Sequence, residues 1–485
     1  MKLNDTSLFR QQCYIDGQWL DADGGATIDV TNPADNSVLG TIPKMGAAET
    51  ARAIAAANTA FATWRTLTAK DRASKLRRWY ELMLENQEDL AALMTAEQGK
   101  PLAEARGEIG YAASFIDWFA EEGRRIYGDT IPPHQADKRI VVIKEPVGVC
   151  AAITPWNFPT AMITRKAGPA LAAGCTMVVK PATATPYSAL ALCELAERAG
   201  IPKGVLSVVT GSSAAIGGEM TSNKQVRKLT FTGSTEIGKL LMEQCAGTVK
   251  KMSMELGGNA PFMVFDDADL DAAVEGAIMS KYRNAGQTCV CANRLLVHES
   301  VYDDFAARLA GKVEAMKVGD GTEEGVVQGP LIDMAAVEKV EAHISDAVNK
   351  GASVAVGGAR HALGGTFFQP TVLTNVKTNM AVANEETFGP VAPLFKFGSD
   401  DEAIRMANDT EFGLAAYFYS RDIGRIWRVS EALEYGIVGI NTGIISTEIA
   451  PFGGMKESGI GREGSKYGID EFLEIKYLCM GGVDS

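Results

Sequence analysis

The sequence predicts an α/β protein built from two sheet-containing domains and a small β element. Its 485 residues exceed what one hydrophobic core usually serves, so more than one domain is expected. From 147 to 256, short apolar runs alternate with helical segments. This pattern is typical of a doubly wound parallel sheet that binds ligands at the carboxyl ends of its strands. A second α/β pattern runs from about 269 to beyond 441.

The individual elements follow from the spacing of apolar residues. Residues 47–127 carry them three to four positions apart and are expected to be largely helical, and 139–144 is expected to be a strand. The prolines at 132–133 indicate an excursion between these two segments. Later strands are expected at 147–153, 176–179, 205–209, 228–231, 251–256 and 261–265, with an edge strand at 472–478. Helices are expected at 162–173, 189–199, 214–221 and 237–246.

Charge and cysteine content restrict the class of partner. The net charge of −13 disfavours nucleic acid and acidic membrane surfaces, since phosphate binding needs clustered cations. No secretory leader is visible, and no stretch approaches the roughly 18 apolar residues of a membrane span. The eight cysteines show neither metal-site spacing nor the density of a disulfide scaffold. We therefore expect a cytoplasmic protein that acts on a small molecule and holds no metal.

Cys289 is the strongest candidate for a nucleophile. It follows a Gly-Gln-Thr turn outside any apolar run, and Arg283 lies six residues upstream, as expected for an anionic substrate held beside a thiol. The other cysteines are expected to be small core residues. Cys291 is two positions away, and its spacing permits a reversible disulfide with Cys289, although inert packing is the simpler interpretation.

Two further residues have side chains suited to chemistry at strand ends. Asn157, after the first strand of the parallel unit, can direct an amide toward a developing oxyanion, or it can simply cap its own turn. Glu255 ends a strand before a glycine turn, where it is either a general base or a surface carboxylate. Taken singly, the structural interpretation of each is the more common one.

A dinucleotide site is indicated, but not by the usual glycine fingerprint, which the chain lacks. Gly233 and Ser234 begin a helix whose amino end can hold a pyrophosphate. The same string resembles a phosphate-binding P-loop, but Leu240 replaces the required Ser or Thr, and a glycine turn without a ligand is a further alternative. Lys180 ends a strand where a ribose would bind, and no carboxylate follows it before Thr183, which favours NADP over NAD.

Together these segments resemble the aldehyde dehydrogenase superfamily. The matching strings are Pro155-Trp156-Asn157-Phe158-Pro159, Lys180-Pro181-Ala182, Phe231-Thr232-Gly233-Ser234, Glu255-Leu256-Gly257-Gly258, Gly286-Gln287-Thr288-Cys289, Glu386-Thr387-Phe388-Gly389-Pro390 and Pro451-Phe452-Gly453-Gly454. They span most of the chain. The resemblance implies a Rossmann-like coenzyme domain at 1–123 and 147–256, an α/β catalytic domain at 257–467, and a small β oligomerisation element at 124–146 and 468–485. It also implies a homodimer or homotetramer.

The resemblance also implies a mechanism. Cys289, as thiolate, attacks an aldehyde, and the Asn157 amide with the Cys289 backbone N–H holds the oxyanion. Glu255 then activates the water that hydrolyses the thioester. By the same resemblance the cofactor site comprises Trp156, Asn157, Lys180, Thr183, Gly233, Ser234, Leu256, Glu386 and Phe388, and it takes NADP, with NAD less preferred.

Three strings are similar to the bacterial NADP-preferring succinate-semialdehyde dehydrogenases: Thr164-Arg165-Lys166-Ala167-Gly168, Tyr282-Arg283-Asn284 and Gly443-Ile444-Ile445-Ser446. They imply that Arg165, Arg283 and Ser446 hold the distal carboxylate of succinate semialdehyde. Glutarate semialdehyde, one methylene longer, is the alternative substrate, since a methylene gives only about 1–3 kcal/mol of discrimination. A coenzyme A-acylating enzyme is disfavoured because Glu255 can activate water. A non-catalytic protein of the same fold is disfavoured by the full set of Asn157, Glu255 and Cys289.

Overall fold

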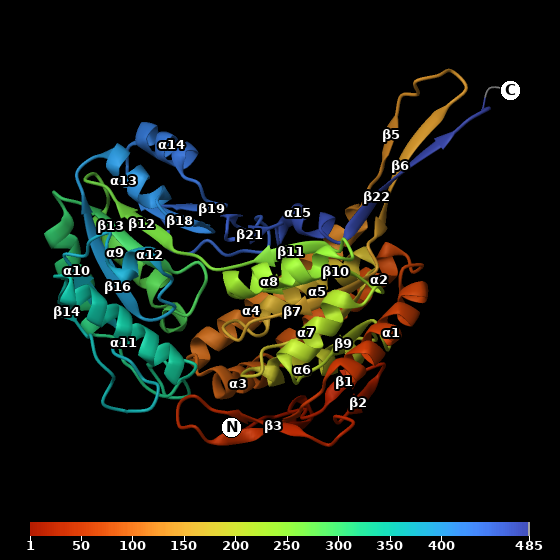
Figure 1. Ribbon diagram of the computed structural model, residues 1–485, viewed down its shortest axis with the longest axis horizontal. Coiled ribbons are helices and arrows are strands. Elements are labelled where there is room, and N and C mark those ends of the chain that lie inside the picture. Colours follow the sequence, from red (N-terminus) through yellow and green to blue (C-terminus); the bar gives the residue numbers. More distant parts are fainter. Residues whose placement is uncertain (484–485) are drawn as a thin grey trace.

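Two mixed sheets organise the chain, and a narrow β arm projects from one of them (Figure 1). The computed structural model describes residues 1–483. The first sheet has the strand order β2-β1-β9-β8-β7-β10-β11-β21. Its strands are β1 (Cys13–Ile15), β2 (Gln18–Leu20), β7 (Val149–Ile153), β8 (Thr176–Lys180), β9 (Leu206–Val208), β10 (Val226–Thr232), β11 (Lys251–Glu255) and β21 (Gly459–Ile460).

The centre of the first sheet is parallel and covered on both faces. β9, β8, β7, β10 and β11 pair in parallel, which requires crossover helices. The helices are α1 (Ala47–Trp64), α2 (Ala69–Glu85), α3 (Gln87–Gln98), α4 (Leu102–Glu122), α5 (Ala161–Ala173), α6 (Pro186–Arg198), α7 (Ser213–Ser222) and α8 (Thr235–Ala246). Alternate β7 side chains enter two different cores. Cys150 and Ala152 pack with helices α2 to α6, and Val149 and Ala151 pack with α1, α7 and α8.

The second sheet has the order β14-β15-β16-β13-β12-β18-β19, parallel except between β14 and β15. Its strands are β12 (Ala260–Val264), β13 (Ala292–His298), β14 (Ser353–Val356), β15 (Thr371–Thr374), β16 (Val391–Phe397), β18 (Ala415–Tyr419) and β19 (Ile437–Ile440). Its helices are α9 (Leu270–Lys281), α10 (Tyr302–Glu314), α11 (Met334–Asn349), α12 (Ala381–Asn384), α13 (Asp400–Asn408) and α14 (Ile423–Ala432). Helices α9 and α10 pack on one face of this sheet, and α11 to α14 pack on the other.

Short elements complete the chain. They are two-stranded pairs of β3 (Thr27–Thr31) with β4 (Val38–Pro43) and of β17 (Phe412–Gly413) with β20 (Met455–Lys456), the 3-10 turns η1 (Thr6–Leu8), η2 (Gly123–Arg125) and η3 (Arg283–Gly286), and helix α15 (Ser465–Asp470). In the described part of the chain, no helix combines the length and the apolar character that crossing a membrane requires.

The arm is a three-stranded antiparallel sheet that extends away from both lobes (Figure 1). It consists of β5 (Asp129–Ile131), β6 (Arg139–Pro146) and β22 (Leu473–Met480), with β22 at one edge. Ile475 is 73% exposed and Tyr477 57% exposed, so the arm presents apolar side chains to its surroundings.

The predicted fold class is confirmed, and the predicted strands and helices are present within a few residues. The sheet between 147 and 256 is not wholly parallel, because β1, β2 and β21 add antiparallel edges that are too short to show a pattern in the sequence. The domain boundaries stay a prediction. β21 pairs with β11 of the first sheet although it falls within the predicted catalytic domain, and Asp484 and Ser485 of the predicted oligomerisation element lie outside the described residues.

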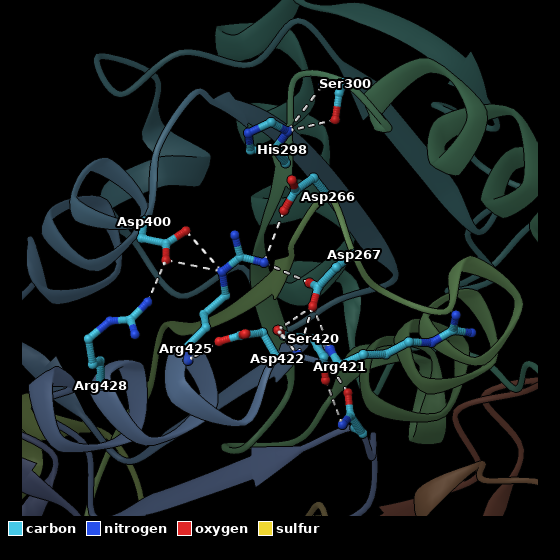
Figure 2. Close-up of polar contacts among 11 residues, drawn as sticks. Asp266, Asp267, His298, Ser300, Asp400, Ser420, Arg421, Asp422, Arg425 and Arg428 are labelled. Carbon is cyan, nitrogen blue, oxygen red and sulfur yellow. Dashed lines mark hydrogen bonds and ion pairs between the residues drawn. The ribbon is translucent and has the colours of Figure 1, made fainter.

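The carboxyl edge of the second sheet is closed by ion pairs (Figure 2). Arg425 of α14 contacts Asp266, Asp267 and Asp400 at 3.0, 2.7 and 3.0 Å. We call these four residues the carboxyl-edge network. Asp267 also accepts hydrogen bonds from three donors after β18: the Ser420 hydroxyl and the backbone amides of residues 421 and 422.

Candidate active site

The predicted site residues lie where the carboxyl edge of the first sheet faces the amino edge of the second. The loops after β7 and β10 leave the first sheet at the point where the strand order reverses, which is where ligands of doubly wound sheets bind. A cavity of about 220 Å³, here the switch-point cavity, lies there. The predicted residues that line it are Trp156, Asn157, Gly233, Ser234, Leu256, Cys289, Glu386 and Phe388.

Cys289 connects this cavity to a second one. A smaller cavity of about 20 Å³, here the inner cavity, is lined by Cys289 together with Arg165, Arg283 and Ser446. Six of the eight cysteines are buried and Cys479 is exposed, whereas Cys289 is partly exposed. The thiol is therefore accessible both from the side predicted to bind the coenzyme and from the side predicted to bind the substrate.

The surroundings of the Cys289 thiol disfavour its ionised form. Burial raises the pKa of this thiol to about 12, although Arg165 acts in the opposite direction. The carboxyl groups of Glu386 and Glu255 raise the pKa further. Because the thiolate is the reactive species, attack by Cys289 requires removal of the thiol proton and is favoured at high pH.

The loop that carries Cys289 has an unusual backbone. Asn284, Ala285 and Gly286 are all left-handed, with φ of 51°, 53° and 75°. Such a conformation is uncommon for residues other than glycine and must be held by its surroundings. Gly286 is required by contact as well, because a Cβ there would lie 2.1 Å from the Gly389 carbonyl oxygen. The Cys289 loop thus packs directly against the loop that carries Glu386 and Phe388.

Asn284 anchors this loop through its side chain. Its amide donates to the carbonyl oxygens of Asn157 and Gln287 at 3.1 and 3.3 Å, and its side-chain oxygen accepts from Gln98 at 3.0 Å. Its backbone N–H donates to the Glu104 carboxylate at 2.8 Å. This hydrogen bonding stabilises the left-handed turn that brings Cys289 to the two cavities.

Asn157 is fixed beside the same loop. Its amide nitrogen donates to the Gln287 carbonyl oxygen at 3.0 Å, which uses one of the two amide hydrogens. Its backbone oxygen accepts from Lys100 at 2.9 Å, and the buried Lys100 is paired with Glu108. The second amide hydrogen of Asn157 has room to donate to an oxyanion at Cys289, as the resemblance implies.

Glu255 is a buried carboxyl group, not the surface residue that the sequence alone made more probable. It ends β11 and is 3% exposed, and neither side-chain oxygen has a hydrogen-bond partner among the described residues. Burial and the nearby Glu463 raise its pKa well above the ordinary value. A carboxyl group left without a partner in the interior costs free energy, which agrees with the predicted role as a base, although Glu255 lines neither the switch-point cavity nor the inner cavity.

Glu463 links Glu255 to the inner cavity. It is buried, and it pairs with Arg165 at 2.8 Å and with Lys166 at 2.6 Å. Burial opposes its ionisation, but Lys166 and Arg165 together hold its pKa below the ordinary value. The ionised Glu463 therefore holds Arg165 in place and keeps a negative charge near Glu255.

The inner cavity contains hydrogen-bond donors without acceptors. Arg165 is 1% exposed, and its Nη2 has no hydrogen-bond partner among the described residues. Its guanidinium lies 3.9 Å from the centre of the Phe452 ring, while Nε pairs with Glu463 and Nη1 contacts the Met162 sulfur. The Tyr111 hydroxyl, on the same cavity, is likewise buried and makes no hydrogen bond of normal geometry within residues 1–483, and the Ser446 side chain beside it interacts with it. Unpaired buried donors of this kind are suited to an anion.

Arg283 borders two spaces. It lines the inner cavity and also a larger outer cavity of about 420 Å³. Its guanidinium lies 5.2 Å from the centre of the Phe158 ring, whose other close cation is Lys100 at 3.9 Å. Arg283 is therefore placed between the reacting thiol and a wider opening.

The residues predicted to hold a nicotinamide ribose form one wall of the switch-point cavity. Glu386 accepts from the Gly258 backbone N–H at 3.2 Å, and burial raises its pKa to about 7. The Phe388 ring packs edge-on against Trp156 with centroids 5.6 Å apart. Phe388 has a left-handed φ of 53°, a strained conformation for an aromatic residue.

Lys180 and Thr183 line neither the switch-point cavity nor the inner cavity. Lys180 ends β8, next to β7, and burial lowers its pKa to about 8. Its ammonium donates to the Pro181 carbonyl oxygen at 3.1 Å and has no acidic partner within residues 1–483. Thr183 lies half-buried in the following turn. Ser234 caps helix α8 by accepting from the Ile237 N–H at 3.4 Å, so its hydroxyl hydrogen remains available to a ligand.

Cys291 is turned toward the interior. Its thiol donates to the Lys281 carbonyl oxygen at 3.3 Å, it is 1% exposed, and it lines neither of the two cavities. Both Cys289 and Cys291 are free thiols. This arrangement agrees with inert packing of Cys291, and a disulfide between the two stays an untested prediction.

Several residues that hold the site together have no predicted role. They are Lys100, Glu108, Tyr111, Lys166 and Glu463. Lys166 carried one detectable signal, because it lies beside Arg165 in a helix, Ala161–Ala173, that otherwise has no charged residue and is buried throughout. Two cations in such a helix require acidic partners or ligands. Nothing in the sequence around Glu463 indicates that it supplies the partner.

Comparisons with known proteins agree over nearly the whole chain. The sequence model described as the aldehyde dehydrogenase family matches residues 19–478. The chain is 70% identical over 483 residues to the glutarate-semialdehyde dehydrogenase of Pseudomonas aeruginosa, with all of both chains covered. It is 69% identical over 481 residues to the succinate-semialdehyde dehydrogenase [NADP(+)] of Escherichia coli K12, with 99% of this chain and 100% of that one covered.

Solved structures show the same architecture. One described as an NADP-dependent enzyme of E. coli matches with a TM-score of 0.99 at 69% identity. The match covers 99% of this chain and all of the other. The resemblance drawn from the sequence motifs is therefore confirmed.

Proposed function

Because the chain belongs to the aldehyde dehydrogenase family, whose members are oxidoreductases, we propose that it oxidises succinate semialdehyde to succinate with NADP as the coenzyme. The observation that carries the proposal is the unpartnered Nη2 of the buried Arg165 beside Cys289. A buried guanidinium edge without an acceptor is suited to a carboxylate at the far end of the substrate.

The residues of this chain support a thioester mechanism. The Cys289 thiol first gives its proton to solvent water, and the thiolate sulfur then bonds to the aldehyde carbon. The carbonyl electrons move to oxygen, where the free Asn157 amide hydrogen and the Cys289 backbone N–H stabilise the charge. The bound coenzyme supplies the acceptor for the hydride. Glu255, when ionised, takes a proton from the water that attacks the resulting thioester and releases the acid with the Cys289 thiol.

The coenzyme fits the switch-point cavity. Gly233 lines this cavity, and glycine is required there because a Cβ would lie 2.4 Å from the Phe231 ring. Leu256 and Trp156 supply apolar walls, and Glu386 supplies an acceptor. Lys180, a buried cation without an acidic partner among the described residues, supports the 2′-phosphate of NADP, with NAD as the weaker alternative.

We assign the substrate carboxylate to the residues that line the inner cavity. Arg165 and Arg283 supply positive charge, and Tyr111 and Ser446 supply neutral donors. In a chain of net charge −13, such a local pair of cations requires specific support, and Glu463 gives it to Arg165. Their joint position next to Cys289 favours an aldehyde with an anionic end.

Glutarate semialdehyde is a second candidate substrate. The 70% identity to a glutarate-semialdehyde dehydrogenase favours it, as does the outer cavity that opens beyond Arg283. A side chain at the border of two cavities can move outward to accept one more methylene. Discrimination by about 1–3 kcal/mol would still leave both compounds as substrates.

The arm supports association with a second copy of the chain. β22 presents a solvent-facing edge and exposed apolar side chains, which a free surface rarely retains without a partner. A homodimer or homotetramer built through the arm is the assembly we propose.

An initial-rate panel tests the substrate assignment. The purified enzyme is given succinate semialdehyde, glutarate semialdehyde and butanal, each with NADP and with NAD. We expect the two carboxylated aldehydes to be preferred over butanal by at least about 10²-fold in kcat/KM, which corresponds to roughly 3 kcal/mol for charged hydrogen bonds.

A matched pair of variants tests the carboxylate clamp. Arg283→Ala should raise KM for the semialdehydes by about 10-fold or more and leave that for butanal within twofold. Arg421→Ala removes an exposed arginine far from both cavities and should change nothing. Equal effects of Arg283→Ala on charged and uncharged aldehydes would refute the clamp.

A further inference from the structure

His343 is a buried histidine next to the coenzyme side of the site. It lies on α11 and is 4% exposed, whereas the other three histidines, His134, His298 and His361, are partly or fully exposed. Its Nε2 lies 3.2 Å from the Glu385 carboxylate, and its Nδ1 lies 3.2 Å from the Thr387 hydroxyl.

Successive side chains of the loop after α12 face His343 and the switch-point cavity in turn. Glu385 and Thr387 turn back to His343, and the residues between and after them, Glu386 and Phe388, line the cavity. This alternation is the pattern of an extended segment with one face on each side. One imidazole thus contacts both backward-facing side chains of the segment that carries the two coenzyme residues.

Helix α11 backs this loop at a second point. A Cβ on Gly389 would lie 2.4 Å from a methyl carbon of Val340, one turn before His343 on α11. On the coenzyme side the same segment, in which Phe388 has a left-handed φ of 53°, contacts the Trp156 ring and the Gly258 N–H, and its other side rests on α11. The helix therefore supplies both the packing and the polar contacts that hold the segment.

We propose that His343 is a positioning residue that sets the pose of Glu386 and Phe388 against the coenzyme. The inference rests on the proposed function. The neutral ring satisfies both contacts: Nε2–H donates to the Glu385 carboxylate, and Nδ1 accepts from the Thr387 hydroxyl. Burial lowers the pKa of His343, which favours this neutral form. The charged groups that face the ring are Glu385, Lys339 and Asp346.

The test separates coenzyme positioning from the rest of the chemistry. His343→Leu removes both polar contacts, and His343→Gln retains a donor and an acceptor. Three quantities are measured: the Kd of NADPH by fluorescence titration, the primary isotope effect with succinate semialdehyde deuterated at the aldehyde carbon, and hydrolysis of p-nitrophenyl acetate without coenzyme. The ester reaction needs Cys289 and water but no coenzyme.

We expect His343→Leu to weaken NADPH binding by 10-fold or more and to raise the isotope effect on kcat, because hydride transfer from a misplaced pose becomes slower. Ester hydrolysis should stay within twofold of the wild type, and His343→Gln should recover most of both losses. His298→Gln is the matched control, because His298 contacts Ser300 on the far edge of the second sheet, and it should behave as the wild type (Figure 2).

Two results would overturn the inference. One is unchanged NADPH affinity and isotope effect in a folded His343→Leu enzyme. The other is a parallel fall in ester hydrolysis, which would indicate general loss of structure. Should His343→Leu fail to fold, Thr387→Val removes one of the two contacts with the ring intact and should give an intermediate loss of affinity. A wild-type enzyme that binds NADPH but oxidises no semialdehyde would instead refute the proposed function.

Discussion

The carboxyl edges of the two sheets occupy equivalent places in similar folds, yet their polar groups are arranged in opposite ways. At the first edge, Glu255 is buried with no hydrogen-bond partner among the described residues. At the second edge, Asp267 accepts from Ser420, two backbone amides and Arg425, and these donors hold its pKa below the ordinary value despite burial (Figure 2).

The difference shows that the hydrogen-bond partners of a buried polar group indicate whether the group serves stability or the active site. Charges whose partners are all supplied within the protein, such as those of the carboxyl-edge network, are expected to act through stability alone. Groups left unpaired in the interior lower stability, so their retention indicates a ligand or a reaction. The second sheet instead contributes to the site through its amino edge, where Cys289 precedes β13. The position of a residue at a strand end is thus less informative than whether its hydrogen bonds are satisfied.

The sharpest test of this comparison is Cys289→Ala. We expect kcat for semialdehyde oxidation to fall by at least about 10⁴-fold, because no other thiol lines both cavities. The free energy of unfolding should change by less than about 1 kcal/mol, since the residue is partly exposed. Turnover is followed by NADPH absorbance and stability by urea denaturation. Substantial residual oxidation would show that the nucleophile lies elsewhere.

Glu255→Gln should separate acylation from deacylation. Loss of a general base costs about 10²–10⁴-fold in steady-state rate, but a burst of one NADPH per site should remain, because the hydride leaves before water attacks. In the wild type, kcat should rise with pH, since the raised pKa of Glu255 keeps it protonated at low pH. Rapid-mixing absorbance measures the burst. Its disappearance would place Glu255 in the acylation step.

Glu255→Gln should also raise the unfolding free energy of the protein. When the pKa of a carboxyl group is higher in the folded than in the unfolded state, the unfolding free energy of the protein falls as pH rises from the unfolded pKa toward the folded pKa. The Gln variant lacks this loss, so its advantage in unfolding free energy should grow between pH 5 and pH 8. Denaturant midpoints at several pH values measure it. An advantage that shrinks with rising pH would mean that Glu255 is stabilised as an anion.

Arg425→Ala should have the reverse profile at the second edge. Removing the cation leaves Asp266 and Asp267 without an ion-pair partner and Asp400 with only the exposed Arg428, and a partly buried cluster of this kind should lose about 2 kcal/mol of unfolding free energy at pH 7. The loss should diminish as pH falls through the lowered pKa of Asp267. Turnover should stay within about twofold.

Arg428→Ala is the matched control for that cluster. Arg428 is 66% exposed and contacts only Asp400 among the described acidic residues, at 3.5 Å. Its loss should cost no more than about 0.5 kcal/mol. A large loss of activity in Arg425→Ala would contradict the separation between a stabilising edge and a reactive one.

The sequence predicted the sheets, and it indicated candidate reacting groups, because both leave local signals. Apolar runs of strand length identify β7 to β12, and a glycine loop before a thiol identifies Cys289. The short antiparallel strands β1, β2 and β21 were missed because two or three residues carry no periodicity. Their pairing is decided by tertiary contact.

The supporting residues of the site could not be predicted for a related reason. Glu463 acts on Arg165 from 298 positions away in the chain, and Lys100 acts on Asn157 from 57 positions away. Partners so distant in sequence meet only in the folded chain. The orientation of the Cys291 thiol toward Lys281 also depends on the geometry of the folded turn. The two-residue spacing from Cys289 could not predict this orientation.

Tyr111→Phe has the smallest expected effect of these substitutions. It tests whether the Tyr111 hydroxyl is an unpaired group of the active site or a hydrogen-bonded group like those of the carboxyl-edge network. The Tyr111 hydroxyl is buried and makes no hydrogen bond of normal geometry among the described residues, so its removal should leave the unfolding free energy unchanged or raise it by up to about 1 kcal/mol. If the hydroxyl donates to the substrate carboxylate, KM for succinate semialdehyde should rise by about 5–10-fold, equivalent to roughly 1 kcal/mol, with KM for butanal unchanged. Initial rates and denaturant titrations on one preparation measure both. A loss of stability without a change in KM would mean that the hydroxyl is satisfied within the protein and belongs with the saturated groups of the second edge.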